Sequence, residues 1–156
     1  TKGESTTRQW LNDMQAHGVK TFPDEFQVSN TVANGSILTG FANHYYALRV
    51  KNSRPNAPVD LAFTSGDAGA LINVSGAEII KGTDNQTLAE NFIRHLLSAE
   101  AQEFFATRTF AYPTVPDIPP VGGLPSIDEL NPPSIDLQKL SETGPTLELL
   151  RETGAL

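Results

Sequence analysis

The chain has 156 residues, enough for one domain that buries about two thirds of the surface exposed by the unfolded chain. Eighteen acidic and eleven basic residues give a net charge of -7, which argues against nucleic acid or an anionic membrane as a partner. The absence of cysteine excludes disulfides, thiolate metal sites and cysteine nucleophiles. No apolar run approaches the roughly 20 residues of a membrane span, and the first residues lack the apolar segment of a secretory leader.

The first third of the chain predicts helices that alternate with short strands. Thr7 is a candidate N-cap for a first helix, which should end at Gly18. Residues 19–22 then predict a short strand, and residues 23–25 predict the turn into a second helix that ends at Gly35.

Three further apolar runs predict strands, at residues 37–42, 59–64 and 70–74, and residues 65–69 predict a turn between the last two. Helices alternating with such strands indicate an α/β fold, with a mixed sheet flanked by helices.

The second half of the chain has a long amphipathic run followed by a proline-rich tract, and no predicted strands. Residues 87–105 are strongly amphipathic and predict two helices, with Ser98 capping the second. The proline-rich tract at residues 113–133 predicts an extended strap with apolar anchors. A short helical piece is expected at residues 137–140, and a last helix should begin near Pro145.

The most informative residues follow the run at 37–42. Asn43 and His44 come first, and Tyr45 and Tyr46 follow directly. A phenol has a pKa near ~10, so both groups are neutral at pH 7 unless a strongly electropositive ion displaces their protons. A trivalent metal can do so, and ferric iron is therefore the ligand that the pair suggests first.

Backbone geometry sets a condition on that interpretation. In a regular strand, Tyr45 and Tyr46 would point to opposite faces and could not share one ion. They converge only if the chain turns, and Asn43 is a possible N-cap for a helix over residues 47–50 and beyond. The alternative is that both tyrosines cover the edge of a core with their hydroxyls in water. The spacing alone leaves both interpretations open.

Several longer segments carry a likeness to one known family. They are residues 7–11, 32–35, 43–46, 69–77, 92–102 and 112–151. Together they resemble the C-terminal half of the periplasmic ferric-iron-binding proteins, the substrate-binding components of iron(III) ABC importers. The combination of the tyrosine pair with the Asn-Val-Ser-Gly of residues 73–76 is the specific part of this likeness.

The resemblance implies the two-lobed architecture of type II periplasmic binding proteins, in which the lobes close on a ligand. Residues 1–75 would form a second-lobe α/β segment that carries the tyrosine pair. Residues 76–125 would return to the first lobe, and residues 126–156 would end the strap and pack C-terminal helices on the second lobe. About half of a usual family member, the N-terminal part of the first lobe, is missing from the chain and would be its partner.

The resemblance also implies a site. Tyr45 and Tyr46 would be ligands of Fe(III), a synergistic carbonate or phosphate would complete the coordination, and Asn43 would help to hold that anion. Glu25 departs from the family, which often has asparagine there. A carboxylate at this position would either repel the anion or replace it as an oxygen donor.

The implied function is binding without catalysis, with delivery of iron to a membrane permease. The expected location is periplasmic or extracellular, at a membrane if the protein is a lipoprotein. The alternatives are another ligand in the same fold, such as an inorganic anion, a polyamine or thiamine, or a structural or enzymatic α/β domain. A serine hydrolase is disfavoured because no Gly-x-Ser-x-Gly motif is present. With half of the fold missing, exposed Phe92, Phe104 and Phe105 predict self-association or segment swapping.

Overall fold

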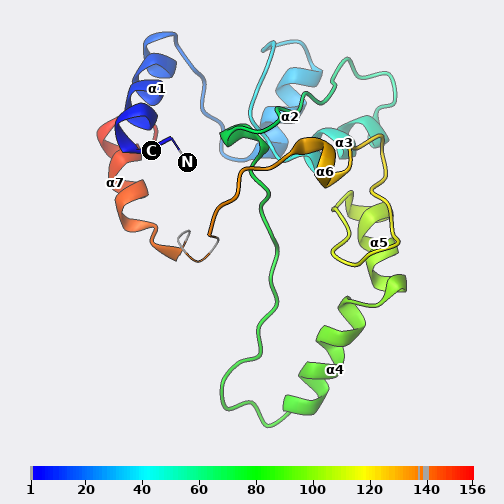
Figure 1. The fold of residues 1–156 in the computed structure, drawn as a ribbon. Helices are drawn as coiled ribbons and strands as arrows, with labels where there is room; N and C mark the ends of the chain where they lie inside the picture. Colours follow the sequence, from blue (N-terminus) through cyan, green and yellow to red (C-terminus); the bar gives the residue numbers. More distant parts are fainter. Residues whose placement is uncertain (1, 137, 139–140) are drawn as a thin grey trace.

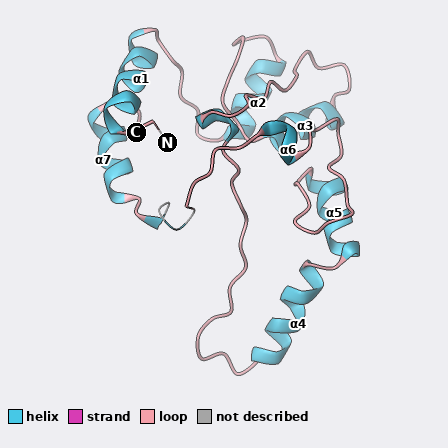
Figure 2. Cartoon of the chain, viewed as in Figure 1, coloured by secondary structure: helices cyan, strands magenta, loops and turns pink. Residues whose placement is uncertain are grey.

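The computed structural model describes residues 2–136, 138 and 141–156, and in this part of the chain all regular structure is helical (Figures 1 and 2). The elements are α1 (Glu4–Ala16), α2 (Glu25–Ala33), α3 (His44–Ser53), the 3₁₀ turn η1 (Ala68–Ala70), α4 (Gln86–Leu96), α5 (Ala99–Thr109), α6 (Ile127–Leu130) and α7 (Gly144–Glu152). The helical piece expected at residues 137–140 lies outside the described residues, apart from residue 138. Within the described ranges, no helix is both long and apolar enough to cross a membrane.

Helices α1 and α7 lie side by side near the two chain ends (Figure 1). Arg8 Nη1 donates to Glu152 Oε2 at 2.7 Å, and Gln15 Nε2 donates to the Gly154 carbonyl at 3.0 Å. These contacts join the beginning of the chain to its end. The predicted Thr7 N-cap is wrong, because α1 begins at Glu4 after Gly3, whose φ of 82° suits glycine.

Helices α2 and α3 form the small core of the molecule. Asp24 caps α2 by accepting a hydrogen bond from the Gln27 backbone N–H at 2.7 Å, so the predicted turn at residues 23–25 is confirmed. Ala33 on α2 and Ala47 and Val50 on α3 are buried together with Val59 from the following loop. Because this packing holds the two helices against each other, it also sets the position of their N-termini relative to each other.

The mixed sheet predicted from the sequence is wrong for the described residues, because none of the four strand predictions, at 19–22, 37–42, 59–64 and 70–74, is realised (Figure 2). A strand is defined by a neighbour that accepts and donates its backbone hydrogen bonds, and these segments have no such neighbour in the described part. Several of their apolar side chains are uncovered: Leu38 is 93% exposed, and Phe41 and Val74 are exposed too, whereas Val59 and Ala70 are buried.

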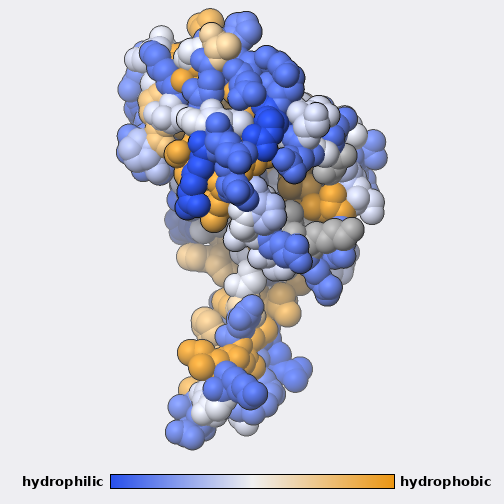
Figure 3. Space-filling view, turned by 90° about the vertical axis from the view of Figure 1, so that its left-hand side faces the viewer, coloured by the Kyte–Doolittle hydropathy of each residue, from blue (hydrophilic) through white to orange (hydrophobic). Residues whose placement is uncertain are grey.

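Helices α4 and α5 form an arm that projects from the rest of the molecule, reached by a long extended segment (Figure 1). The predicted break is confirmed, since Ser98 Oγ accepts from the Ala101 N–H at 3.3 Å at the start of α5. Apolar side chains gather on this arm in Figure 3, and α4 buries none of its residues. Phe92 and Phe104 are 59% and 56% exposed, while Phe105 is half-buried.

The strap after α5 is fastened by one buried amide. Gln102 donates from Nε2 to the Leu96 carbonyl at 2.8 Å, and its Oε1 accepts from the Thr114 N–H at 2.8 Å. The strap ends in α6, a short helix that the sequence analysis missed. Ser126 and Glu129 form a capping box there, a Ser-x-x-Glu pattern that could have revealed the helix.

We expect Val50→Ala to lower the free energy of unfolding by about 2 kcal/mol, because Val50 is 1% exposed and its loss leaves a cavity in the core between α2 and α3. Urea unfolding followed by far-ultraviolet circular dichroism measures the change. Leu38→Ala is the matched control, expected within about 0.5 kcal/mol of the parent. Equal losses in both variants would contradict this account of the core.

We expect the purified chain to self-associate at high concentration, because the apolar face of α4 and α5 is uncovered. Multi-angle light scattering measures the mass as concentration rises. The double variant Phe92→Ser with Phe104→Ser should remain monomeric over a wider range. A monodisperse monomer of the parent chain throughout that range would contradict the expectation.

Candidate functional site

Tyr45 and Tyr46 lie at the beginning of α3, directly after a turn of the backbone. Asn43 is the N-cap and has extended dihedral angles, φ −63° and ψ 139°, whereas His44 and the two tyrosines are helical. The tyrosine ring centroids are 4.6 Å apart with an angle of 50° between the ring planes. The turn that the sequence analysis required is therefore present, and it brings the two neighbouring rings together.

Asn43 and Glu25 are joined by a hydrogen bond between the beginnings of α2 and α3. Asn43 caps no backbone N–H of its own helix with its side chain. Instead, its Nδ2 donates to Glu25 Oε2 at 2.8 Å. Two helix N-termini, each with partial positive charge, thus lie at one place, and both side chains are half-buried.

Arg49 also belongs to this cluster, although the sequence analysis did not single it out. Its Cζ lies 5.5 Å from the centroid of the Tyr45 ring and 5.8 Å from that of Tyr46, within the range of cation–π contacts. The signal was available in the spacing, because a residue three or four positions along a helix shares a face with the pair.

The pKa of Tyr45 is raised above its usual value of 10. Burial is the largest cause, followed by the neighbouring Tyr46 phenol and the negative charge of Glu25, whereas the positive charge of Arg49 acts in the opposite direction. The phenol of Tyr45 is therefore neutral at pH 7, and a cation that binds its oxygen must displace the proton.

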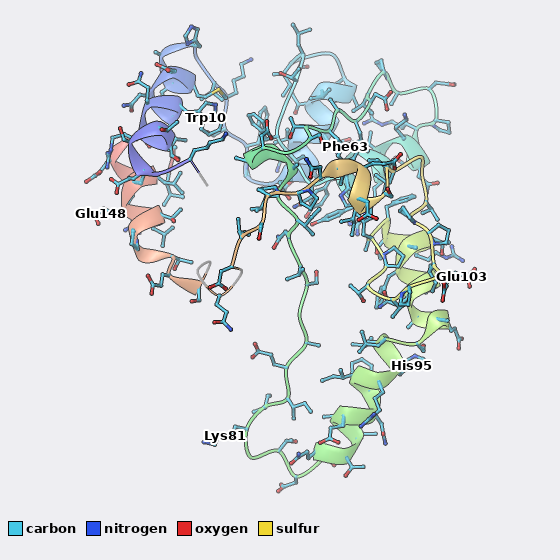
Figure 4. The ribbon with its side chains drawn as sticks, in the orientation of Figure 1. Trp10, Phe63, Lys81, His95, Glu103 and Glu148 are labelled. Atoms are coloured by element: carbon cyan, nitrogen blue, oxygen red, sulfur yellow. The ribbon has the colours of Figure 1, made fainter. Side chains whose placement is uncertain are left out.

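His44 supports the pair from the other side. Its Nε2 lies 2.7 Å from the Phe110 carbonyl, so this nitrogen carries the proton and donates. The imidazole packs edge-on against Tyr45 and Tyr112, and burial lowers its pKa while the bond to Phe110 raises it. The side chain joins α3 to the end of α5. By contrast, His95 lies exposed on the arm (Figure 4).

A hollow of about 360 Å³ lies between the strap and α6, and its lining includes Tyr112, Ile118 and Asp128. None of the four predicted site residues lines it. Across the described residues there is also no group of three or more His, Cys, Asp or Glu side chains that could hold a metal. Any metal site at the start of α3 thus depends on phenol oxygens, which lie outside that set of residue types.

No protein-family model matches the chain. Among curated proteins, it is 30% identical over 156 residues to the major ferric iron-binding protein of Neisseria meningitidis, covering 98% of this chain and 47% of that protein. It is 30% identical to iron uptake protein A2 of Synechocystis, covering 97% of this chain and 47% of that protein. It is also 26% identical to the Fe(3+)-binding periplasmic protein of Serratia marcescens, with 99% and 46% covered.

Among solved structures, iron-bound HitA from Pseudomonas aeruginosa superposes with a TM-score of 0.87 at 27% sequence identity, covering 98% of this chain and 50% of that one. The fold is thus that of one portion of a periplasmic binding protein. More particularly, the resemblance to the ferric-iron-binding proteins is confirmed along nearly the whole chain. The chain spans about half the length of the curated relatives that it matches.

We expect Arg49→Gln to raise the pKa of Tyr45 further, because it removes the charge that favours the phenolate. Titration of the phenolate absorbance, with Tyr45→Phe subtracted, measures the shift. Arg54→Gln is the control, since Arg54 bonds Asn30 and Asn34 instead. An unchanged pKa in Arg49→Gln would contradict the assigned role.

The raised pKa of Tyr45 also affects stability. Because its pKa is higher in the folded chain, Tyr45 stabilises the fold below pH ~10, and this contribution is lost as the pH rises through the folded pKa.

Proposed function

We propose that the protein is a non-catalytic binding protein for ferric iron, with Tyr45 and Tyr46 as phenolate ligands. The observation that carries the proposal is the pair of adjacent rings at the first turn of α3, 4.6 Å apart. The choice of ferric iron as the ligand is based on relatives whose names state ferric iron binding, and their match covers almost all of this chain.

The local electrostatics support phenolate ligation. Tyr45 resists ionisation because it is partly buried, so only a strongly Lewis-acidic ion can take the place of its proton. Both rings belong to the first turn of α3, and the guanidinium carbon of Arg49 lies 5.5 and 5.8 Å from their centroids; the helix N-terminus and the guanidinium both favour negative charge on the pair. The site therefore disfavours phenolate without the metal and stabilises it when the metal arrives.

Two phenolates fill only part of the coordination shell of ferric iron. The remaining oxygens come from groups outside the pair, and a carbonate or phosphate near Asn43 is the candidate that the family resemblance implies. Further ligands would come from the first lobe, closing over the pair. The two-lobed division, with residues 1–75 and 126–156 in one lobe and residues 76–125 in the other, belongs to this proposal.

The uncovered surfaces support a missing half as partner. The exposed apolar face of α4 and the unpaired extended segments need apolar cover and backbone partners. The relatives are about twice as long as this chain, and a segment that corresponds to their additional length would provide both the apolar cover and the backbone partners. A periplasmic location completes the proposal and agrees with the name of one relative, the Fe(3+)-binding periplasmic protein of Serratia marcescens. Delivery of iron to an ABC permease, an extracellular location and a lipid anchor rest on the family resemblance alone.

Titration of the purified chain with ferric nitrilotriacetate tests the proposal. We expect a visible phenolate-to-iron charge-transfer band that grows to one equivalent. Tyr45→Phe and Tyr46→Phe should each weaken binding by about tenfold or more, because each removes an anionic ligand.

Tyr112→Phe is the matched control. Its hydroxyl donates to the Pro125 carbonyl at 2.8 Å and takes no part in the pair, so its band should equal that of the parent. A parent chain that stays colourless, or a band that survives the loss of both Tyr45 and Tyr46 hydroxyls, would sink the proposal.

A further inference from the structure

We propose that Glu25 is itself an iron ligand, the third anionic oxygen of the site, so that iron is retained without an added small anion. This inference rests on the proposed function and names the group that completes the negative charge of the site. In this arrangement the carboxylate of Glu25, held by Asn43, takes the place of a bound carbonate or phosphate.

The first support is the bond from Asn43 to Glu25. The Asn43 amide is a polar donor two residues before Tyr45, and its Nδ2 already donates to Glu25 Oε2 at 2.8 Å. An external anion at the same place would have to displace the carboxylate from this donor. It would also approach a fixed negative charge, which costs free energy in a partly buried setting.

The second support is that the carboxylate of Glu25 is not committed elsewhere. Its neighbour Asp24 caps α2 through Gln27, and Glu129 closes the capping box of α6. Within the described residues, no ion pair involves Glu25, and its one side-chain hydrogen bond leaves Oε1 available to a metal.

The third support is charge balance. Two phenolates and one carboxylate carry three negative charges, which neutralise the three positive charges of the ferric ion. Glu25 begins α2, the helix that packs on α3, and it bonds Asn43, two residues before Tyr45. With Glu25 present, the ion needs only neutral oxygen donors, such as water, to complete its shell.

The test compares iron retention with and without anions. The parent chain, Glu25→Gln and Glu25→Asp are loaded from ferric nitrilotriacetate and passed into buffer free of phosphate and bicarbonate, and bound nitrilotriacetate is quantified. The parent should keep its visible band with far less than one equivalent of any anion. Glu25→Gln should lose iron about 10- to 100-fold more readily, and added phosphate or bicarbonate should restore its band.

Controls separate a ligand from a merely structural role. Glu25→Asp keeps the charge and should retain iron without added anion, at reduced affinity. Glu103→Gln alters an exposed carboxylate on the arm, and its retention should equal that of the parent (Figure 4). Asn43→Ala should weaken retention less than Glu25→Gln, since it frees the carboxylate without removing it. Circular dichroism confirms that each variant keeps its helices.

The outcomes distinguish this inference from the proposed function. If Tyr45→Phe abolishes the band while Glu25→Gln retains iron as the parent does in anion-free buffer, the role of Glu25 is refuted and the tyrosine site stands. One equivalent of anion bound to the parent also refutes it. If the parent never develops a band, the proposed function itself fails.

Discussion

The packing of α2 against α3 is the constraint on which the candidate site depends. Ala33, Ala47 and Val50 are small enough to let the two helices approach closely, and burial of their apolar surface holds the approach. The consequence lies at the other end of the helices. Their N-termini meet, so that Glu25 of one helix reaches Asn43 at the start of the other, and the tyrosine pair follows in the next turn.

Elsewhere in the described part of the chain, several non-helical segments lack the neighbouring strands that would let them form a sheet. Residues 39–43 and 71–80 form neither helix nor turn, and exposed Phe41 and Val74 are side chains that a sheet could cover, yet no described strand lies beside them to pair with. Helix α4 has the same character on a larger scale, because it is amphipathic yet none of its residues is buried. The helices form because their hydrogen bonds join residues close in sequence. The strands do not form because their hydrogen bonds would need a distant partner segment.

This division explains how far the sequence could predict the fold. Helices were accessible because their signals are local, as with Asp24 before α2 and Ser98 before α5. The strands failed because pairing is a relation between distant segments, which no run of apolar residues reveals. Within the site, the residue type of Asn43 predicted the start of a helix, although its side chain bonds Glu25 and does not cap α3. The contact of Arg49 with both rings could have been found from its spacing, whereas the bond from Asn43 to Glu25 required the packing of two helices.

The electrostatics of the cluster also bear on selectivity. Burial, the neighbouring Tyr46 phenol and the carboxylate of Glu25 keep Tyr45 protonated, while Arg49 and the start of α3 place positive charge close by. A divalent ion meets that positive charge with little power to displace phenolic protons. A ferric ion displaces those protons more readily, because its attraction to each phenolate oxygen scales with its three charges. Because Tyr45 gives up its proton only to a strongly Lewis-acidic ion, the proposed site favours a trivalent ion over divalent ions.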